Sequence, residues 1–346
     1  MRQEYMDWFD EAVPYLQKYQ QNCVVVKYGG NAMTNDSIKA SVLRDVLFLN
    51  QVGVKIVLVH GGGPDINAGL AKIGKKGEFI GGLRVTDTET MEVVQQVLAG
   101  KVNKNLVAHL GGRGIGLCGI DGGLLHCEAL DPALGAVGKI SRVQPNIIHL
   151  LLGAGMIPVV ASIGTDDAGN SYNINADTAA AAIATAIGAC KLVNMTDIAG
   201  LLRDINDENT LIRDIRIDEA EALISQGIIS GGMLPKIACC IDAVRQGVPE
   251  VAIIDGRRPH SVLQELFSDR GSRPKGSLKT RRVRPAHRNA QTNNRRSVPL
   301  RQKKQPENPK SSLKTKKPPQ RRFQAAPTNP RPIRQPAPPN PLFRLP

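Results

Sequence analysis

The sequence predicts an α/β protein, a three-layer αβα sandwich with a mostly parallel central sheet. Short apolar runs typical of buried strands alternate along the chain with segments of helical periodicity, the pattern of parallel sheets with helices on both faces. Two of these runs, near residues 24–26 and 56–59, lead into consecutive glycines. Glycine lets backbone N–H groups approach an anion closely, so these strand ends suit a phosphate-sized ligand.

The first half of the chain is expected to contain strands at residues 23–26, 55–59 and 115–118 and helices at residues 38–52 and 86–100, followed by another helical stretch. Val42, Val46 and Leu49 recur on one face of the first of these helices. Pro64 opens a helix after the second strand, at a position where its missing N–H costs nothing. The sequence Thr-Asp-Thr-Glu at residues 86–89 is a capping box, which predicts a helix start.

The second half repeats the alternation. Residues 121–143 are rich in glycine and alternate in polarity, which predicts β-ribbons. The expected strands are residues 157–161, 192–195 and 251–254, and the expected helices are residues 147–152, 176–187, 218–226, 235–245 and 260–267. The run at residues 176–187 is alanine-rich, so we expect a buried helix there.

Residues 1–20 are predicted to form an N-terminal amphipathic helix. Their apolar residues recur at helical spacing: Tyr5, Trp8, Phe9, Ala12, Leu16 and Tyr19. Such a helix can lie on its own domain or dock onto another subunit, and the sequence leaves both open.

The end of the chain differs in composition from the rest. Residues 273–346 hold 21 Lys+Arg, one acid and 15 of the 23 prolines, so they carry a net charge of +20 and the remainder carries −6 of the +14 total. This composition buries too little surface to fold, which predicts a disordered basic tail. Three interpretations of the tail are open: a solvated appendage without a specific role, an out-of-frame or fused sequence that replaces the native end, or a tether to nucleic acid or an acidic surface. Nucleic-acid binding is not the expected main role, because only Phe323 and Phe343 could stack on bases.

The folded part is therefore expected at residues 21–272. The six cysteines form no C-x-x-C pair and no metal-like spacing, so they are expected to be reduced thiols. The N-terminus lacks a signal-like or transit-like composition, and no apolar run is long enough to span a membrane. We expect a cytoplasmic protein, or a stromal one if a plastid genome encodes it, without membrane attachment.

Three matches to known motifs do not indicate the function of the motif that they resemble. Residues 114–119 match the dinucleotide pattern G-x-G-x-x-G, but they lie within an expected strand instead of opening a helix. Residues 69–76 resemble a Walker A loop without its Ser/Thr. The His-Gly-Gly-Gly at residues 60–63 resembles a hydrolase oxyanion loop, but the chain contains no G-x-S-x-G nucleophile motif.

Five motifs at strand and helix ends remain: Lys27-Tyr-Gly-Gly30, His60-Gly-Gly-Gly63, Gly82-Leu-Arg-Val-Thr-Asp87 with Arg84, Asn173-Ile-Asn-Ala-Asp177 and Gly231-Gly-Met-Leu-Pro-Lys236. Together they make residues 5–271 resemble the amino acid kinase family, and the third and fourth point to its acetylglutamate kinase branch. The resemblance implies the amino acid kinase fold, with an N-lobe at about residues 21–190 that binds N-acetyl-L-glutamate and a C-lobe at about residues 191–272 that binds ATP.

The implied reaction is the ATP- and Mg²⁺-dependent phosphorylation of the γ-carboxylate of N-acetylglutamate, a step of arginine biosynthesis. A carboxylate is already ionised at neutral pH, so no general base is needed and the barrier is the approach of two anions. Positive charge and oriented donors lower that barrier. Two alternatives remain: another carboxylate kinase of the family, such as an acetylaminoadipate kinase, and a non-enzymatic polybasic binder of nucleic acid or surfaces.

The resemblance also implies residue roles. Lys27 and Lys236 would stabilise the transferring phosphoryl group, and Asp177 would orient both lysines. Four residues are implied to contact N-acetylglutamate, with Arg84 binding its α-carboxylate: Gly62, Gly63, Arg84 and Asn173. Five are implied to contact ATP or its phosphates: Gly29, Gly30, Thr196, Asp197 and Met233. No protein ligand to a metal ion is implied.

Relatives with an N-terminal helix form dimers or hexamers through it, so the resemblance implies a homo-oligomer. In those relatives arginine, the feedback inhibitor, binds beside that helix near the segment that matches residues 259–261. Binding of the PII nitrogen-signal protein is a further implication. After residue 272 the sequence departs from the family, which continues into a short apolar closing strand.

Overall fold

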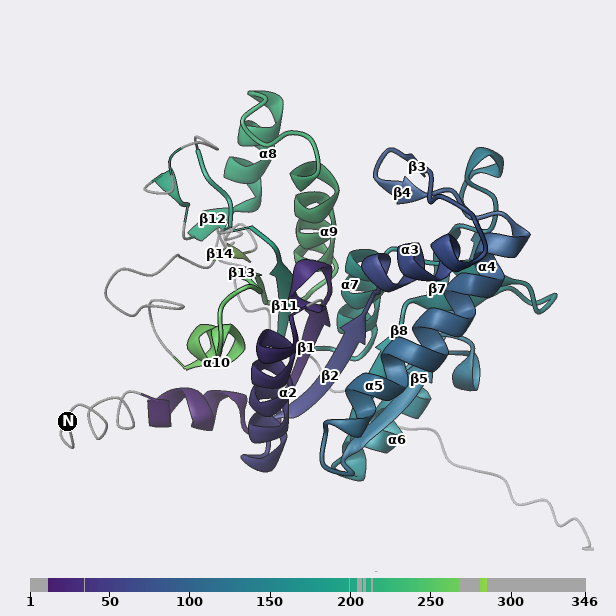
Figure 1. Cartoon of the computed structure of the whole chain (residues 1–346). Helices are drawn as coiled ribbons and strands as arrows, with labels where there is room; N and C mark the ends of the chain where they lie inside the picture. Colours follow the sequence, from purple (N-terminus) through teal and green to yellow (C-terminus); the bar gives the residue numbers. More distant parts are fainter. Residues whose placement is uncertain are drawn as a thin grey trace, which may run out of the picture. The chain divides into compact units, whose positions relative to one another are not determined.

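The computed structural model describes residues 12–33, 35–198, 200–203, 207, 210–212, 214–267 and 281–284 (Figure 1). The chain divides into two units, residues 1–289 and 290–346, and all described residues belong to the first. Among these residues no helix is both long and apolar enough to cross a lipid bilayer.

A parallel six-stranded arrangement forms the centre of the fold, as the alternation of strands and helices predicted. In spatial order the strands are β13 (Glu250–Asp255), β11 (Lys191–Thr196), β1 (Cys23–Tyr28), β2 (Lys55–His60), β8 (Ile157–Ala161) and β5 (Gly114–Cys118). In five of these strands every residue after the first is buried, because helices cover both faces, whereas the edge strand β5 is partly exposed. All carboxyl ends therefore meet at one edge of the sheet.

Two further strands extend this sheet beside β13. Strand β14 (Arg281–Arg284) pairs antiparallel with β13, and β12 (Asp214–Arg216) pairs parallel with β14. β14 lies in the segment for which the composition predicted no structure, so these four residues differ from that expectation. Strand pairing uses only backbone N–H and C=O groups, and an open sheet edge offers both to a segment of any composition.

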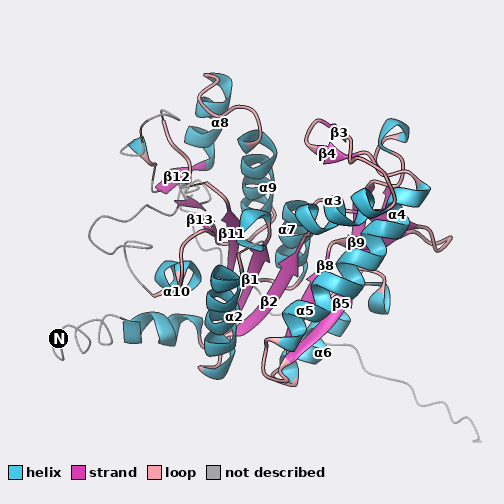
Figure 2. Ribbon diagram, in the orientation of Figure 1, coloured by secondary structure: helices cyan, strands magenta, loops and turns pink. Residues whose placement is uncertain are grey.

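The helices form a layer on each face of the sheet (Figure 2). One layer contains residues 12–19, α2 (Asp36–Gln51), α5 (Asn103–Ala108) and α10 (Ser261–Leu266), and the other contains α6 (Asn146–Gly153), α7 (Ala176–Ala186), α8 (Ile217–Ser225) and α9 (Met233–Arg245). Strand β1 shows the alternation that separates them: Val24 and Val26 pack into the first core and Val25 into the second. The three-layer αβα sandwich is confirmed.

The N-terminal helix is described only in part. Residues 12–19 are helical, and residues 1–11, with Trp8, lie outside the described residues. Ala12 and Tyr19 are buried in the first core, so the described end of this helix packs on its own domain.

Smaller elements lie around the carboxyl edge of the sheet. A second sheet contains β10 (Ser171–Asn173), β9 (Ile163–Thr165), β6 (Leu125–Ala129) and β7 (Gly138–Val143), and β3 (Phe79–Ile80) and β4 (Leu83–Arg84) form a hairpin. The remaining helical elements are α3 (Gly63–Lys72), α4 (Thr88–Gln95), the π-helix η2 (Gln96–Val102) and the 3₁₀ turns η1 (Gly30–Met33), η3 (Asp121–Gly123) and η4 (Pro132–Leu134).

The start of α4 corrects one prediction. The capping box placed the N-cap at Thr86, but the N-cap is Asp87, whose side chain accepts a hydrogen bond from the Thr90 amide. The Thr86 hydroxyl instead donates to the carbonyl of Arg84. An aspartate caps a helix as well as a threonine does, so two candidate caps in adjacent positions cannot be ranked from sequence.

Candidate active site

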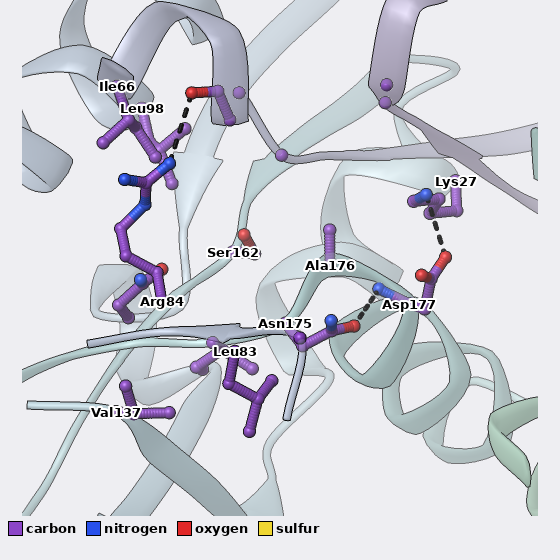
Figure 3. A pocket seen from close by; sticks show the side chains of 18 of the residues that line it. Lys27, Ile66, Leu83, Arg84, Leu98, Val137, Ser162, Asn175, Ala176 and Asp177 are labelled. Atoms are coloured by element: carbon purple, nitrogen blue, oxygen red, sulfur yellow. Dashed lines mark hydrogen bonds and ion pairs between the residues drawn. The ribbon is translucent and has the colours of Figure 1, made fainter. Parts of the chain in front are cut away.

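A pocket of about 200 Å³ lies at the carboxyl edge of the sheet (Figure 3). The ends of β1 and β2 contribute Lys27 and the glycines of both expected loops, and the hairpin, β10 and the start of α7 complete the wall. Eight of the predicted site residues line it: Lys27, Gly29, Gly30, Gly62, Gly63, Arg84, Asn173 and Asp177. The parallel order of β11, β1 and β2 brings these distant segments together.

The carboxylate of Asp177 bridges two lysines from different parts of the chain. Its Oδ1 lies 2.9 Å from Lys27 Nζ, and its Oδ2 lies 3.0 Å from Lys236 Nζ. Lys27 is the second-last residue of β1 and is 6% exposed, whereas Lys236 is in the first turn of α9 with a side chain 27% exposed. Lys27 Nζ also donates to the carbonyl oxygen of Met195, at 3.5 Å. Two ammonium groups thus share one anion, which leaves one positive charge uncompensated within the trio.

The start of helix α7 fixes the position of this carboxylate. The side chain of Asn175 caps the helix by accepting from the amides of Asp177 and Thr178. Burial alone raises the pKa of Asp177, but the charges and hydrogen bonds of Lys27 and Lys236 outweigh it, and the pKa ends below its ordinary value. Asp177 is therefore an anion at neutral pH although it is only 8% exposed.

Arg84 lies at the other end of the pocket from Lys27 (Figure 3). Its Nη2 donates to Asn67 Oδ1 at 2.7 Å and lies 3.4 Å from the carbonyl of Gly63, and its guanidinium lies over the Phe79 ring at 4.7 Å. Burial lowers the pKa of Arg84, but from an ordinary value above 12, so it stays a cation. Its buried Nη1 has no hydrogen-bond partner among the described residues. The Nη1 group of this positively charged arginine is therefore available to donate a hydrogen bond to a ligand.

The residues that hold Arg84 were not predicted from the sequence. Asn67 is an unremarkable helix residue and Phe79 lies on a two-residue strand, so neither carries a signal in the sequence. Gly77 completes the arrangement, since a Cβ at this position would lie 2.2 Å from Arg84 Nη1. Asn67, Phe79 and Gly77 all contact the Arg84 guanidinium and together restrict its orientation.

Asn173 is the last residue of β10 and lines the pocket. Its Nδ2 donates to the hydroxyl of Thr86 at 3.1 Å, and its backbone amide donates to the carbonyl of Ala136. The side chain is therefore held in place before any ligand binds. Ser162, which is nearly fully buried, also lines the pocket and was not predicted.

Four predicted site residues do not line this pocket: Lys236, and three of the five residues expected to contact ATP or its phosphates. Thr196 and Asp197 lie at and just after the end of β11, and Met233 begins α9. They nevertheless lie at the same edge of the sheet: a Cβ on Gly30 would be 3.8 Å from Asp197 Cγ. Within the described part of the chain, no three His, Cys, Asp or Glu side chains are grouped to hold a metal ion.

Comparisons with known proteins agree with this geometry. The sequence profile of the amino acid kinase family matches residues 22–255. A protein named acetylglutamate kinase from Actinobacillus pleuropneumoniae serotype 3 is 55% identical over 267 residues, which cover 77% of this chain and 94% of that protein. The acetylglutamate kinase of Heliobacterium modesticaldum is 49% identical over 276 residues, covering 75% of this chain and 94% of that protein.

Solved structures share the fold. N-acetylglutamate synthase from Neisseria gonorrhoeae, complexed with coenzyme A and N-acetyl-glutamate, matches with a TM-score of 0.70 and 25% identity, over 82% of this chain and 64% of that chain. Carbamate kinase from Giardia lamblia bound to AMP-PNP matches with a TM-score of 0.57 at 14% identity, over 77% of this chain and 99% of that one, which is a likeness of fold alone. With its αβα sandwich, its lysine-bridging aspartate and these relatives, the chain belongs to the amino acid kinase family.

Proposed function

We propose that this protein transfers the γ-phosphoryl group of ATP to the γ-carboxylate of N-acetyl-L-glutamate. The observation that carries the proposal is the pair of lysines, one from β1 and one from α9, held by a single carboxylate at a pocket that has a buried arginine at its far end. The names of relatives at 49–55% identity give the acceptor.

In this reaction an oxygen of the substrate carboxylate attacks the γ-phosphorus of ATP. The new P–O bond gives an acyl phosphate, the bond to the β-phosphate oxygen breaks, and its electrons leave with ADP. Both reactants are anions, so the main requirement is positive charge around the transferring group. Lys27 and Lys236 supply that charge from opposite sides of Asp177, and the amides at Gly29, Gly30 and Gly62 are the nearby backbone donors.

The other end of the pocket suits the acceptor's α-carboxylate. A guanidinium binds a carboxylate through two parallel hydrogen bonds, and Arg84 Nη1 is buried without a described partner. Asn173, Gly62 and Gly63 line the same pocket and would contact the remainder of the acceptor. This distribution supports N-acetylglutamate and gives no specific reason to prefer the longer acetylaminoadipate.

ATP would approach from the side of β11 and α9, where Thr196, Asp197 and Met233 lie. Magnesium is expected to arrive bound to the phosphates of ATP as part of the substrate, since the described residues provide no carboxylate cluster for it. The homo-oligomer built through the N-terminal helix, the inhibition by arginine, the partnership with PII and the cytoplasmic location stay predictions.

The direct test is N-acetylglutamate-dependent release of ADP from Mg·ATP by the full chain. The Lys27→Ala/Lys236→Ala double variant should lose at least a thousandfold in kcat, because it removes two charge-stabilising donors and the loss of each costs about 3 kcal/mol, roughly a hundredfold. Phosphoryl transfer at an undiminished rate by the double variant would contradict the proposal. An acceptor panel with glutamate and N-acetyl-2-aminoadipate decides the substrate.

A further inference from the structure

His60, the last residue of β2, is fully buried behind the glycines that follow it. Its Nδ1 lies 2.8 Å from the carbonyl oxygen of Gly61 and therefore carries the proton and donates. Its Nε2 is then the acceptor, and it lies 3.1 Å from Asn103 Nδ2. Burial lowers the pKa of His60 to about 4, so the ring is neutral and keeps this one tautomer at neutral pH.

Asn103, at the start of α5, connects this histidine to two neighbouring strands. Its Nδ2 donates to the carbonyl of Val159 in β8 at 2.8 Å and lies 3.2 Å from the carbonyl of Leu117 in β5. Both partners are acceptors, so the amide nitrogen must point toward them and toward His60. One side-chain amide thus connects the carboxyl-terminal parts of β2 and β5 with the middle of β8.

A π-helical turn directs Asn103 to this position. The backbone amide of Asn103 donates to the carbonyl of Leu98, five residues earlier, which is the π-type hydrogen bond of η2. In an α-helix, residues five apart lie about 140° apart around the axis; the wider π turn brings them nearer to one face. Leu98 and Val102 from the same turn pack against Gly62, where a Cβ would lie 2.7 Å and 3.3 Å from their methyl carbons.

We propose that His60 and Asn103 are positioning residues for phosphoryl transfer, which act by holding the backbone of residues 61–63 in one orientation toward the pocket. The inference rests on the proposed function, in which the amides of Gly62 and Gly63 are donors to the substrates; the amide of Gly61 donates to the carbonyl of Tyr28 in β1. Neither side chain lines the pocket, so neither touches substrate. The loop consists of glycines and has no side chains of its own to fix its backbone. The Tyr28 carbonyl accepts from the Gly61 amide, and the His60–Asn103 pair holds the Gly61 carbonyl on the side away from the pocket.

Four variants of the full chain test this. His60→Leu removes both hydrogen bonds of the ring. Asn103→Leu removes the donor to His60 Nε2 and the hydrogen bonds to the carbonyls of Leu117 in β5 and Val159 in β8. His60→Asn keeps an amide nitrogen near the place of Nδ1, so it retains the donor to Gly61. Leu110→Ala is the matched control: Leu110 is fully buried just beyond α5 and lines no part of the pocket, so it reports general loss of packing.

Two readouts are needed. In steady-state assays, His60→Leu and Asn103→Leu should lower kcat by ten- to a hundredfold while the KM for ATP stays within twofold, because small misplacements of catalytic donors cost up to about a hundredfold. His60→Asn should recover part of that loss, and Leu110→Ala should keep the kcat of the folded protein. Hydrogen exchange of peptides covering residues 58–66 should be faster in the two leucine variants than in the control.

The outcomes separate the two proposals. If the unaltered chain is inactive, the proposed function is contradicted. Hydrogen exchange at residues 58–66 then still decides whether His60 and Asn103 hold the loop. An active unaltered chain with an undiminished kcat in both leucine variants overturns the positioning role. A kcat loss of the same size in Leu110→Ala, or no recovery in His60→Asn, also overturns it, since either result means that general packing is responsible.

Discussion

Replacing Asp177 by asparagine removes the one anion between two lysines without changing the shape of the side chain. At an effective dielectric constant of about 20, each ion pair of about 3 Å is worth about 5 kcal/mol before desolvation is subtracted. Removing one partner of a buried pair costs about 3–5 kcal/mol net. Because the Lys236 side chain is 27% exposed, we expect the lower end, a loss of about 3 kcal/mol in the free energy of unfolding at pH 7.

The pH dependence has a definite sign. The pKa of Asp177 in the folded protein is below its ordinary value, so its stabilising contribution is fully present above the unfolded pKa of about 3.9. The contribution is lost as the pH falls through the lower, folded pKa. The stability difference between the unaltered chain and Asp177→Asn should therefore be constant from pH 7 to about pH 5 and shrink below pH 4.

Urea unfolding at several pH values measures this difference, and N-acetylglutamate-dependent ADP release measures the effect on catalysis. We expect kcat to fall at least a hundredfold, because both lysines lose the group that aims them. Asp242→Asn, on an exposed face of α9, is the matched control and should change neither quantity. An Asp177→Asn variant of undiminished stability at pH 7, or a deficit that grows on acidification, would refute the reasoning.

Three further outcomes follow from the pocket. Arg84→Lys should raise the KM for N-acetylglutamate about tenfold or more with a smaller change in kcat, because an ammonium cannot make the two parallel bonds of a guanidinium; equal affinity by calorimetry would contradict this. Gly77→Ala should also weaken acceptor binding, since its Cβ would lie 2.2 Å from Arg84 Nη1, and unchanged binding would mean that the guanidinium moves freely. Gly62→Ala should lower the free energy of unfolding by about 1 kcal/mol through its clash with Leu98, whereas Gly63→Ala, whose Cβ meets nothing within 4 Å, should not; equal urea midpoints would contradict this.

Much of the fold could be predicted because its signals are local. Apolar runs bounded by glycine placed all six central strands within one or two residues at each end, and alanine content identified the buried helix α7. The spatial grouping of Lys27, Asp177 and Lys236 was expected only through the resemblance to a family; strand alternation gives the common edge of the sheet but not which side chains meet there.

The remaining features depend on contacts between distant segments. No local pattern at Asn67 or Phe79 reveals that Arg84 lies against both, and residues 96–102 look like ordinary helix although they form a π turn. The π turn places Leu98 against Gly62 and Asn103 against His60, and these contacts exist only in the folded domain. β14 was not predicted for a similar reason, since its pairing partner β13 is what orders it.

The two ends of the pocket are built from different elements, and this division bears on how such a site can diversify. Lys27, Asp177 and Lys236, at the proposed phosphate end, come from β1, α7 and α9, whereas the proposed acceptor end at Arg84 is formed by α3 and the β3–β4 hairpin. Substitutions in the hairpin can therefore retune which acid is accepted while the lysine-bearing half stays intact. A scaffold divided in this way can acquire new acceptors by local change at one rim, without rebuilding the part that handles the nucleotide.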